Sequence, residues 1–98
     1  MTINKNRDGT ALTLAVEGRM DTMTAPELEA VLKDELECVE ALTFDFSGLD
    51  YISSAGLRVL LFAQKRMNAQ GTMKVTGVNE IIMEIFDVTG FTDILTIE

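Results

Sequence analysis

Residues 41–67 read ALTFDFSGLDYISSAGLRVLLFAQKRM, and this stretch decides the fold class. Its opening residues favour β-structure and lead into Ser47-Gly48, which predicts a buried strand followed by a turn. Beyond Ser54, apolar residues recur at helical spacing and predict a helix with a wide apolar surface that stops near Gly71. A buried strand that leads into an amphipathic helix is the building unit of an α/β domain.

The chain before this stretch predicts a hairpin. Residues 10–17 alternate in polarity as a half-buried strand does. Asp8-Gly9 is typical of a tight turn, and it would link that strand to a weaker, polar strand at residues 2–7. Gly18 is expected to close the second strand.

A first helix is expected between the hairpin and the buried strand. Thr24 is its predicted N-cap, Pro26 falls in the first turn, and Glu27 completes a capping-box pattern. Apolar residues then recur on one side of the segment and charged residues on the other, which predicts an amphipathic helix to about Val39.

The remaining chain adds a strand, a helix and a short tail. Residues 73–76 predict the strand, Asn79 is the expected cap of the third helix, and Gly90 is its expected terminator. Residues 91–97 predict a final strand or half-turn. The order β-β-α-β-α-β-α predicts a single α/β domain over residues 1–98. We expect a small, mostly parallel sheet with one antiparallel edge strand, flanked by helices.

Composition excludes several classes of function. The 16 Asp and Glu residues outnumber the 8 Lys and Arg residues, and the net charge of −8 repels nucleic acid. The chain has no histidine, so a Ser-His-Asp triad and most zinc sites are excluded. The single cysteine, Cys38, lies among acidic neighbours and is predicted to be a plain packing or surface residue.

Apolar runs are short throughout the chain. The longest, Val59 to Ala63, is far below the roughly 20 residues of a membrane-crossing helix. The first residues contain no apolar segment of a signal peptide. We therefore expect a cytoplasmic protein without membrane contact, and the charge favours a monomer.

A candidate site lies where the predicted strands turn into helices. In open parallel sheets the functional crevice lies at the carboxyl ends of the strands, and here residues 18–24 and 45–57 form the two turns. Ser54 is the predicted N-cap of the helix that follows the second turn. A helix N-terminus tolerates an anion, so Ser54 is a candidate phosphorylation site. The alternative is that Ser54 only caps the helix.

Two other kinds of site are less favoured. Asp21, Asp45 and Asp50 could gather at one sheet edge and hold a divalent cation, but no leading strand carries an acidic pair. The glycine-lysine core of a phosphate-binding P-loop is absent from the sequence. We therefore expect no cofactor and no enzymatic activity.

Three motifs in order resemble the STAS domain of bacterial anti-sigma factor antagonists. They are GRMDTMTAPEL at residues 18–28, DFSGLDYISSAGLRVLL at residues 45–61 and FDVTGF at residues 86–91. Together they cover nearly the whole chain, and the resemblance implies a small sheet flanked by helices.

The resemblance also implies a partner-switching role. In that family the serine at the position of Ser54 is phosphorylated by an anti-sigma factor that is also a serine kinase, and a phosphatase reactivates the protein. The bare antagonist binds the anti-sigma factor and frees a sigma factor, whereas the phosphorylated form lets go. Asp21 falls on an acidic family position beside the serine, where it would position the hydroxyl or contact the kinase.

The expected partner-binding residues lie around this serine, and one position departs from the family pattern. They are Asp21, Thr22, Ser53, Ser54, Gly56, Leu57 and Arg58. The best-known switching members have an aspartate where this chain has Ser53, so Ser53 is an alternative modification site. The other open function is a non-switching scaffold subunit of a transport or stress-signalling assembly.

Overall fold

The first two strands form the antiparallel edge of the sheet. In the computed structural model, which describes all residues 1–98, β1 (Thr2–Asp8) pairs antiparallel with β2 (Ala11–Met20). The register runs from Thr2 opposite Glu17 to Asp8 opposite Ala11, so two residues connect the strands. The predicted hairpin is confirmed.

The rest of the sheet is parallel. β3 (Ala41–Asp45) pairs with β2, and β5 (Thr72–Thr76) pairs with β3, which gives the order β1-β2-β3-β5. The predicted sheet, mostly parallel with one antiparallel edge strand, is confirmed. The chain end adds a single parallel bridge between Val75 and Ile97.

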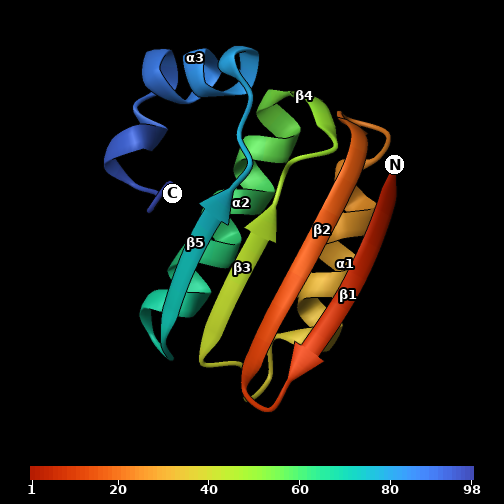
Figure 1. The fold of residues 1–98 in the computed structure, drawn as a ribbon, viewed down its shortest axis with the longest axis vertical. Helices are drawn as coiled ribbons and strands as arrows, with labels where there is room; N and C mark the ends of the chain where they lie inside the picture. The colour runs from red at the N-terminus through yellow and green to blue at the C-terminus, as the bar shows by residue number, and fades with distance from the viewer.

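Two helices cover one face of the sheet, and a third lies at its end. α1 (Ala25–Glu35) and α2 (Ser54–Asn68) lie side by side behind the strands in Figure 1, whereas α3 (Glu80–Thr89) lies beyond the end of β5. The 24 buried apolar residues form one cluster between these layers. With 15 residues, α2 is the longest helix, and no helix could span a membrane.

The sequence did not predict the fifth strand, β4 (Leu49–Ile52), which lies within the segment 45–57 that was expected to be a turn. β4 pairs in parallel with the end of β2, so β2 continues to Met20 and the expected end at Gly18 is wrong. Gly18 instead marks a register shift at φ +99°, a backbone conformation that favours glycine. This irregularity lets β2 leave β3 and pair with β4.

The helix ends also differ in part from expectation. α1 stops at Glu35, short of Val39, because the chain turns back to β3. The Asn79 side chain caps α3 by accepting from the Ile82 N–H at 2.8 Å, and Gly90 ends α3 in the left-handed region, both as predicted. A short 3₁₀ turn, η1 (Phe91–Asp93), follows.

Candidate functional site

The carboxyl ends of β2 and β4 hold the start of α2. The Ser53 N–H donates to the Met20 carbonyl at 2.8 Å, which fixes the last residue before the helix to the sheet. The Ser53 carbonyl accepts the first helical hydrogen bond, from Leu57 N–H at 2.9 Å. Ser54 is therefore the first helical residue, and it is exposed to solvent.

The N-cap of α2 is Ser53 and not Ser54, which corrects the sequence prediction. Ser53 has the extended backbone of an N-cap, with φ −95° and ψ 177°. Its side chain makes no cap hydrogen bond, and its Oγ atom is buried without any partner. The two neighbouring serines thus differ in exposure: the Ser53 hydroxyl is buried, whereas Ser54 is exposed to solvent.

Two of the predicted contact residues belong to the core. A Cβ atom added at Gly56 would lie 2.6 Å from Ile52 Cγ1 and 2.8 Å from Met20 Sδ, and both of those side chains are buried. Leu57 is only 7% exposed. In this conformation Gly56 and Leu57 pack in the core, because the start of α2 lies directly on β2 and β4, and their contact with a partner stays a prediction.

Asp21 organises the loop before α1. Its Oδ1 atom accepts hydrogen bonds from the Met23 N–H at 2.9 Å and the Thr24 N–H at 3.1 Å, and its Oδ2 lies 3.9 Å from Arg19 Nε. The Thr24 N–H has the largest part in lowering the Asp21 pKa below its usual value. Asp21 therefore stabilises the conformation of the loop, and its carboxylate already accepts hydrogen bonds from the loop backbone.

Thr24 stands at the predicted N-cap of α1, but the predicted capping box with Glu27 does not form. The Thr24 Oγ1 atom donates to the Arg19 carbonyl at 2.7 Å and accepts from the Asp21 N–H at 2.8 Å. The hydroxyl therefore bonds to the preceding loop and not to the helix. These bonds connect the end of β2 to the start of α1.

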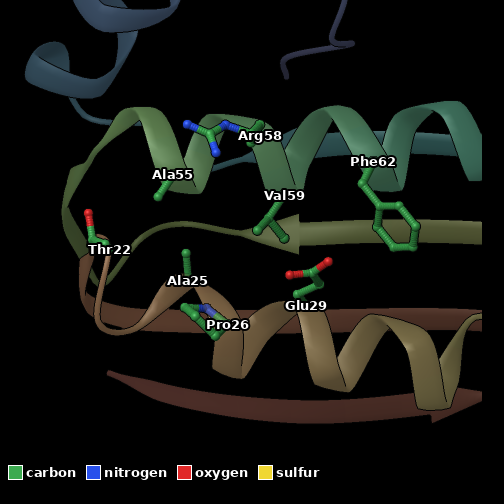
Figure 2. Close-up of a pocket in the computed structure, with 8 residues that line it drawn as sticks. All are labelled: Thr22, Ala25, Pro26, Glu29, Ala55, Arg58, Val59 and Phe62. Atoms are coloured by element: carbon green, nitrogen blue, oxygen red, sulfur yellow. The ribbon is translucent and has the colours of Figure 1, made fainter.

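A groove runs between α1 and α2, and Ala55, the residue after Ser54, is among its lining residues. Its volume is about 450 Å³, and Figure 2 shows the two helices as its walls, with Thr22 from the loop at one end. The lining residues are Thr22, Ala25, Pro26, Glu29, Ala55, Arg58, Val59 and Phe62. Of these residues, the sequence predicts only Thr22 and Arg58 as contact residues. The short side chains of Ala25 and Ala55 leave space between the two helix starts, and they were the signal that could have indicated the groove.

The groove combines an apolar floor with one free cation. Arg58 is exposed and takes part in none of the four ion pairs of the structure. Glu29, on the opposite wall, lies 3.4 Å from Lys33. Met23, in the Asp21 loop, is 84% exposed.

The structure gives no support to the metal site considered above. No group of three or more Asp, Glu or Cys side chains is arranged to hold an ion, so Asp21, Asp45 and Asp50 do not form one. Asp45 instead accepts from the Ser47 hydroxyl at 2.6 Å and the Ser47 N–H at 3.0 Å, and the hydroxyl is the main cause of its lowered pKa.

Comparison with known proteins gives one consistent result. The STAS domain family model matches residues 2–98. BtrV of Bordetella bronchiseptica, named as a candidate anti-sigma factor antagonist, is 33% identical over an alignment of 88 residues that covers 88% of this chain and 76% of that protein. The anti-sigma-B factor antagonist of Bacillus subtilis is 30% identical over 83 residues, which are 84% of this chain and 76% of that protein.

Solved structures share the fold at lower sequence identity. The unphosphorylated anti-sigma factor antagonist SpoIIAA superposes with a TM-score of 0.78 at 12% identity, covering 99% of this chain and 87% of that one. The phosphorylated form of SpoIIAA, a Bacillus cell fate determinant, superposes with a TM-score of 0.77 at 13% identity, covering 99% and 91%. The two forms resemble this chain to nearly the same degree.

Proposed function

Because the chain belongs to the STAS domain family, we propose that it is an anti-sigma factor antagonist that phosphorylation of Ser54 switches off. Relatives that match most of its length carry the name anti-sigma factor antagonist. The observation that carries the proposal is the exposed position of Ser54 at the start of α2, next in the chain to Ala55, which lines the groove between α1 and α2. The partner is an anti-sigma factor with serine kinase activity, and the chain itself has a regulatory role without catalysis.

The modified atom in this proposal is Ser54 Oγ. The partner transfers the γ-phosphoryl group of ATP to this oxygen, the hydroxyl proton goes to a base on the partner, and ADP leaves. A phosphatase later hydrolyses the ester with water and releases inorganic phosphate. The buried Oγ atom of Ser53 supports Ser54 over Ser53 as the acceptor, because an enclosed hydroxyl is out of reach of a kinase.

The bare surface suits a protein partner. Ala55 and Phe62 give the groove half-buried apolar surface, Met23 adds an exposed apolar side chain at the loop, and Ser54 adds no charge. A phosphate adds about −1.5 to −2 charge units, so a partner that covers this surface must desolvate the phosphate or supply a cation. The start of a helix tolerates an anion, so the modification changes the surface and leaves the fold intact.

Phosphorylation is tested with the anti-sigma factor kinase encoded in the same genome. The chain is incubated with that kinase and ATP, and the modified residue is located by tandem mass spectrometry. We expect one phosphate on Ser54, none on Ser54→Ala, and wild-type labelling of Ser53→Ala, the matched control. Labelling of Ser53 alone would contradict Ser54 as the switch residue and move the modification to Ser53. No labelling by any such kinase would contradict the switch and favour the scaffold function.

Binding is tested by calorimetry with the same partner. Ser54→Ala is expected to bind as the bare wild-type chain does. Ser54→Asp is expected to bind at least about tenfold more weakly, which corresponds to about 1.4 kcal/mol. Equal affinities of Ser54→Ala and Ser54→Asp would refute release by a negative charge at this position.

A further inference from the structure

Arg58 lies one helical turn after Ser54 and has no anionic partner. Residues four apart on a helix have Cβ atoms about 5–6 Å from each other on the same face. Arg58 is exposed and makes neither an ion pair nor a side-chain hydrogen bond. In Figure 2 its guanidinium lies toward the N-terminal end of α2, the direction that helical side chains favour. A cation thus extends toward the residue proposed to receive a phosphate.

The carboxylates that face this part of the molecule are engaged elsewhere. On α1, Glu29 lines the same groove but lies 3.4 Å from Lys33 Nζ. In the loop before α1, the Asp21 carboxylate accepts two backbone N–H groups and lies 3.9 Å from Arg19. The guanidinium of Arg58 is therefore available to bind an anion that a partner or a modification supplies.

We propose that Arg58 binds two anions in turn: a carboxylate of the protein partner when Ser54 is bare, and the phosphate on Ser54 when it is modified. The inference rests on the proposed function and names the chemistry of the partner. The partner segment carries an acidic group at Arg58 and apolar side chains over Ala55 and Phe62, the half-buried apolar residues of α2 that line the groove with Arg58. Arg58 is the binding residue shared by the two states.

Competition for Arg58 gives the phosphate on Ser54 two effects on partner binding. A guanidinium can hold a carboxylate or a phosphate in a bidentate pair, but it cannot hold both in the same geometry. The phosphate on Ser54 would be intramolecular and would occupy Arg58 ahead of a partner in solution. Phosphorylation then adds negative charge to the surface and also removes the free cation of the groove.

The phosphate contact is tested without kinase or partner. Phosphoserine is placed at position 54 by genetic encoding, and its second ionisation is followed by ³¹P NMR. In Arg58→Gln the phosphoserine pKa is expected to rise by about 0.5 unit, the shift that an exposed ion pair of about 0.7 kcal/mol produces. Lys65→Gln, which removes one exposed positive charge much farther along the same helix, is expected to leave the titration unchanged. Equal pKa values in wild type and Arg58→Gln would overturn the inference and leave the proposed function standing.

The partner contact is tested with the bare chain and the same anti-sigma factor kinase. Arg58→Gln is expected to weaken binding about fivefold or more, Arg58→Lys to weaken it less, and Lys65→Gln to leave it unchanged. Thermal melts identify any variant that fails to fold. Wild-type affinity in Arg58→Gln would overturn this half of the inference. By contrast, absence of phosphate on Ser54 in the labelling experiment would overturn the proposed function, whatever the NMR result.

Discussion

The three helices of this domain begin in different ways. At α1, Asp21 and Thr24 tie the preceding loop with hydrogen bonds of 2.7–3.1 Å. At α3, the Asn79 side chain accepts from the Ile82 N–H and donates to the Leu49 carbonyl at 3.0 Å. At α2, the Ser53 side chain makes no bond, and Ser54 stands exposed beside it.

The two helix starts held by side-chain hydrogen bonds thus differ from the helix start that carries the proposed modification site. Buried polar groups in native proteins almost always find partners, and a buried hydroxyl without one calls for an explanation. α2 is held at its start by backbone bonds and by the packing of Gly56, so it does not depend on a side-chain cap. A helix start fixed in this way can change its surface chemistry without unfolding. Variants of the packing, capping and exposed residues should therefore differ in their effect on stability.

The largest effect is expected from Gly56→Val. Its side chain would have to enter the space of Ile52 and Met20, which are fully buried, and overpacking of this kind costs about 3 kcal/mol. Chemical denaturation measures the loss in the free energy of unfolding. Ala55→Val is the matched control, because its side chain lines the open groove and only the lower helix propensity of valine, about 0.5 kcal/mol, applies. If the two variants are equally stable, α2 does not depend on Gly56 for its position.

The caps are compared directly by Asn79→Ala and Ser53→Ala. Asn79→Ala removes a cap hydrogen bond and is expected to lower the free energy of unfolding by about 1–2 kcal/mol. Ser53→Ala removes a buried hydroxyl that has no partner, so stability is expected to be unchanged or slightly higher. Thermal and chemical denaturation of both variants measure the difference. A loss in Ser53→Ala as large as in Asn79→Ala would mean that Ser53 does cap α2.

The decrease in the free energy of unfolding at acid pH tests whether the Asp21 carboxylate holds the loop before α1. Hydrogen bonds, chiefly from the Thr24 N–H, lower the pKa of Asp21 in the folded chain below its usual value of 3.8. The stabilisation from the carboxylate is therefore complete above about pH 4 and is lost as pH falls through the lower folded pKa. In Asp21→Asn the free energy of unfolding is expected to be lower at neutral pH and to fall less steeply between pH 4 and pH 2.

The control for this prediction is Asp50→Asn, which removes an exposed carboxylate that makes no hydrogen bond. Denaturant titrations at several pH values compare the slopes. The pKa of Asp45 is lowered chiefly by the Ser47 hydroxyl, so Asp45 also contributes to the loss of stability at acid pH, in wild type and variants alike. A wild-type slope in Asp21→Asn would show that the carboxylate does not hold the loop.

Most of the fold could be predicted because its signals are local. The hairpin turn, the Asn79 cap and the Gly90 terminator each depend on residues close in the chain. The cap and the terminator appear where expected, and the turn falls on Gly9-Thr10, one residue after the expected Asp8-Gly9. β4 could not be predicted, because four residues carry too little periodicity and the strand exists only through pairing with β2. The same pairing explains why β2 continues past Gly18.

The candidate site was predicted less completely, for a related reason. The motif placed Ser54 at the start of α2 and Asp21 in the facing loop, but it could not distinguish the helix surface from the core. Gly56 and Leu57 are buried because β4 lies beneath them, and β4 itself was missed. The groove needs both helices in place, so Val59 and Phe62 carry no signal of it in the sequence.

The smallest stability effect is expected at the residue with the largest proposed role. Ser54 is exposed at the first position of α2 and makes no side-chain hydrogen bond, so Ser54→Ala is expected to change the free energy of unfolding by less than about 0.5 kcal/mol. Had Ser54 been the N-cap, the loss would have been about 1 kcal/mol. Denaturation of Ser54→Ala beside Asn79→Ala measures the contrast in one experiment. A loss in Ser54→Ala that approaches the Asn79→Ala value would place Ser54 among the structural caps, and effects of its variants on partner binding would then have to be separated from unfolding.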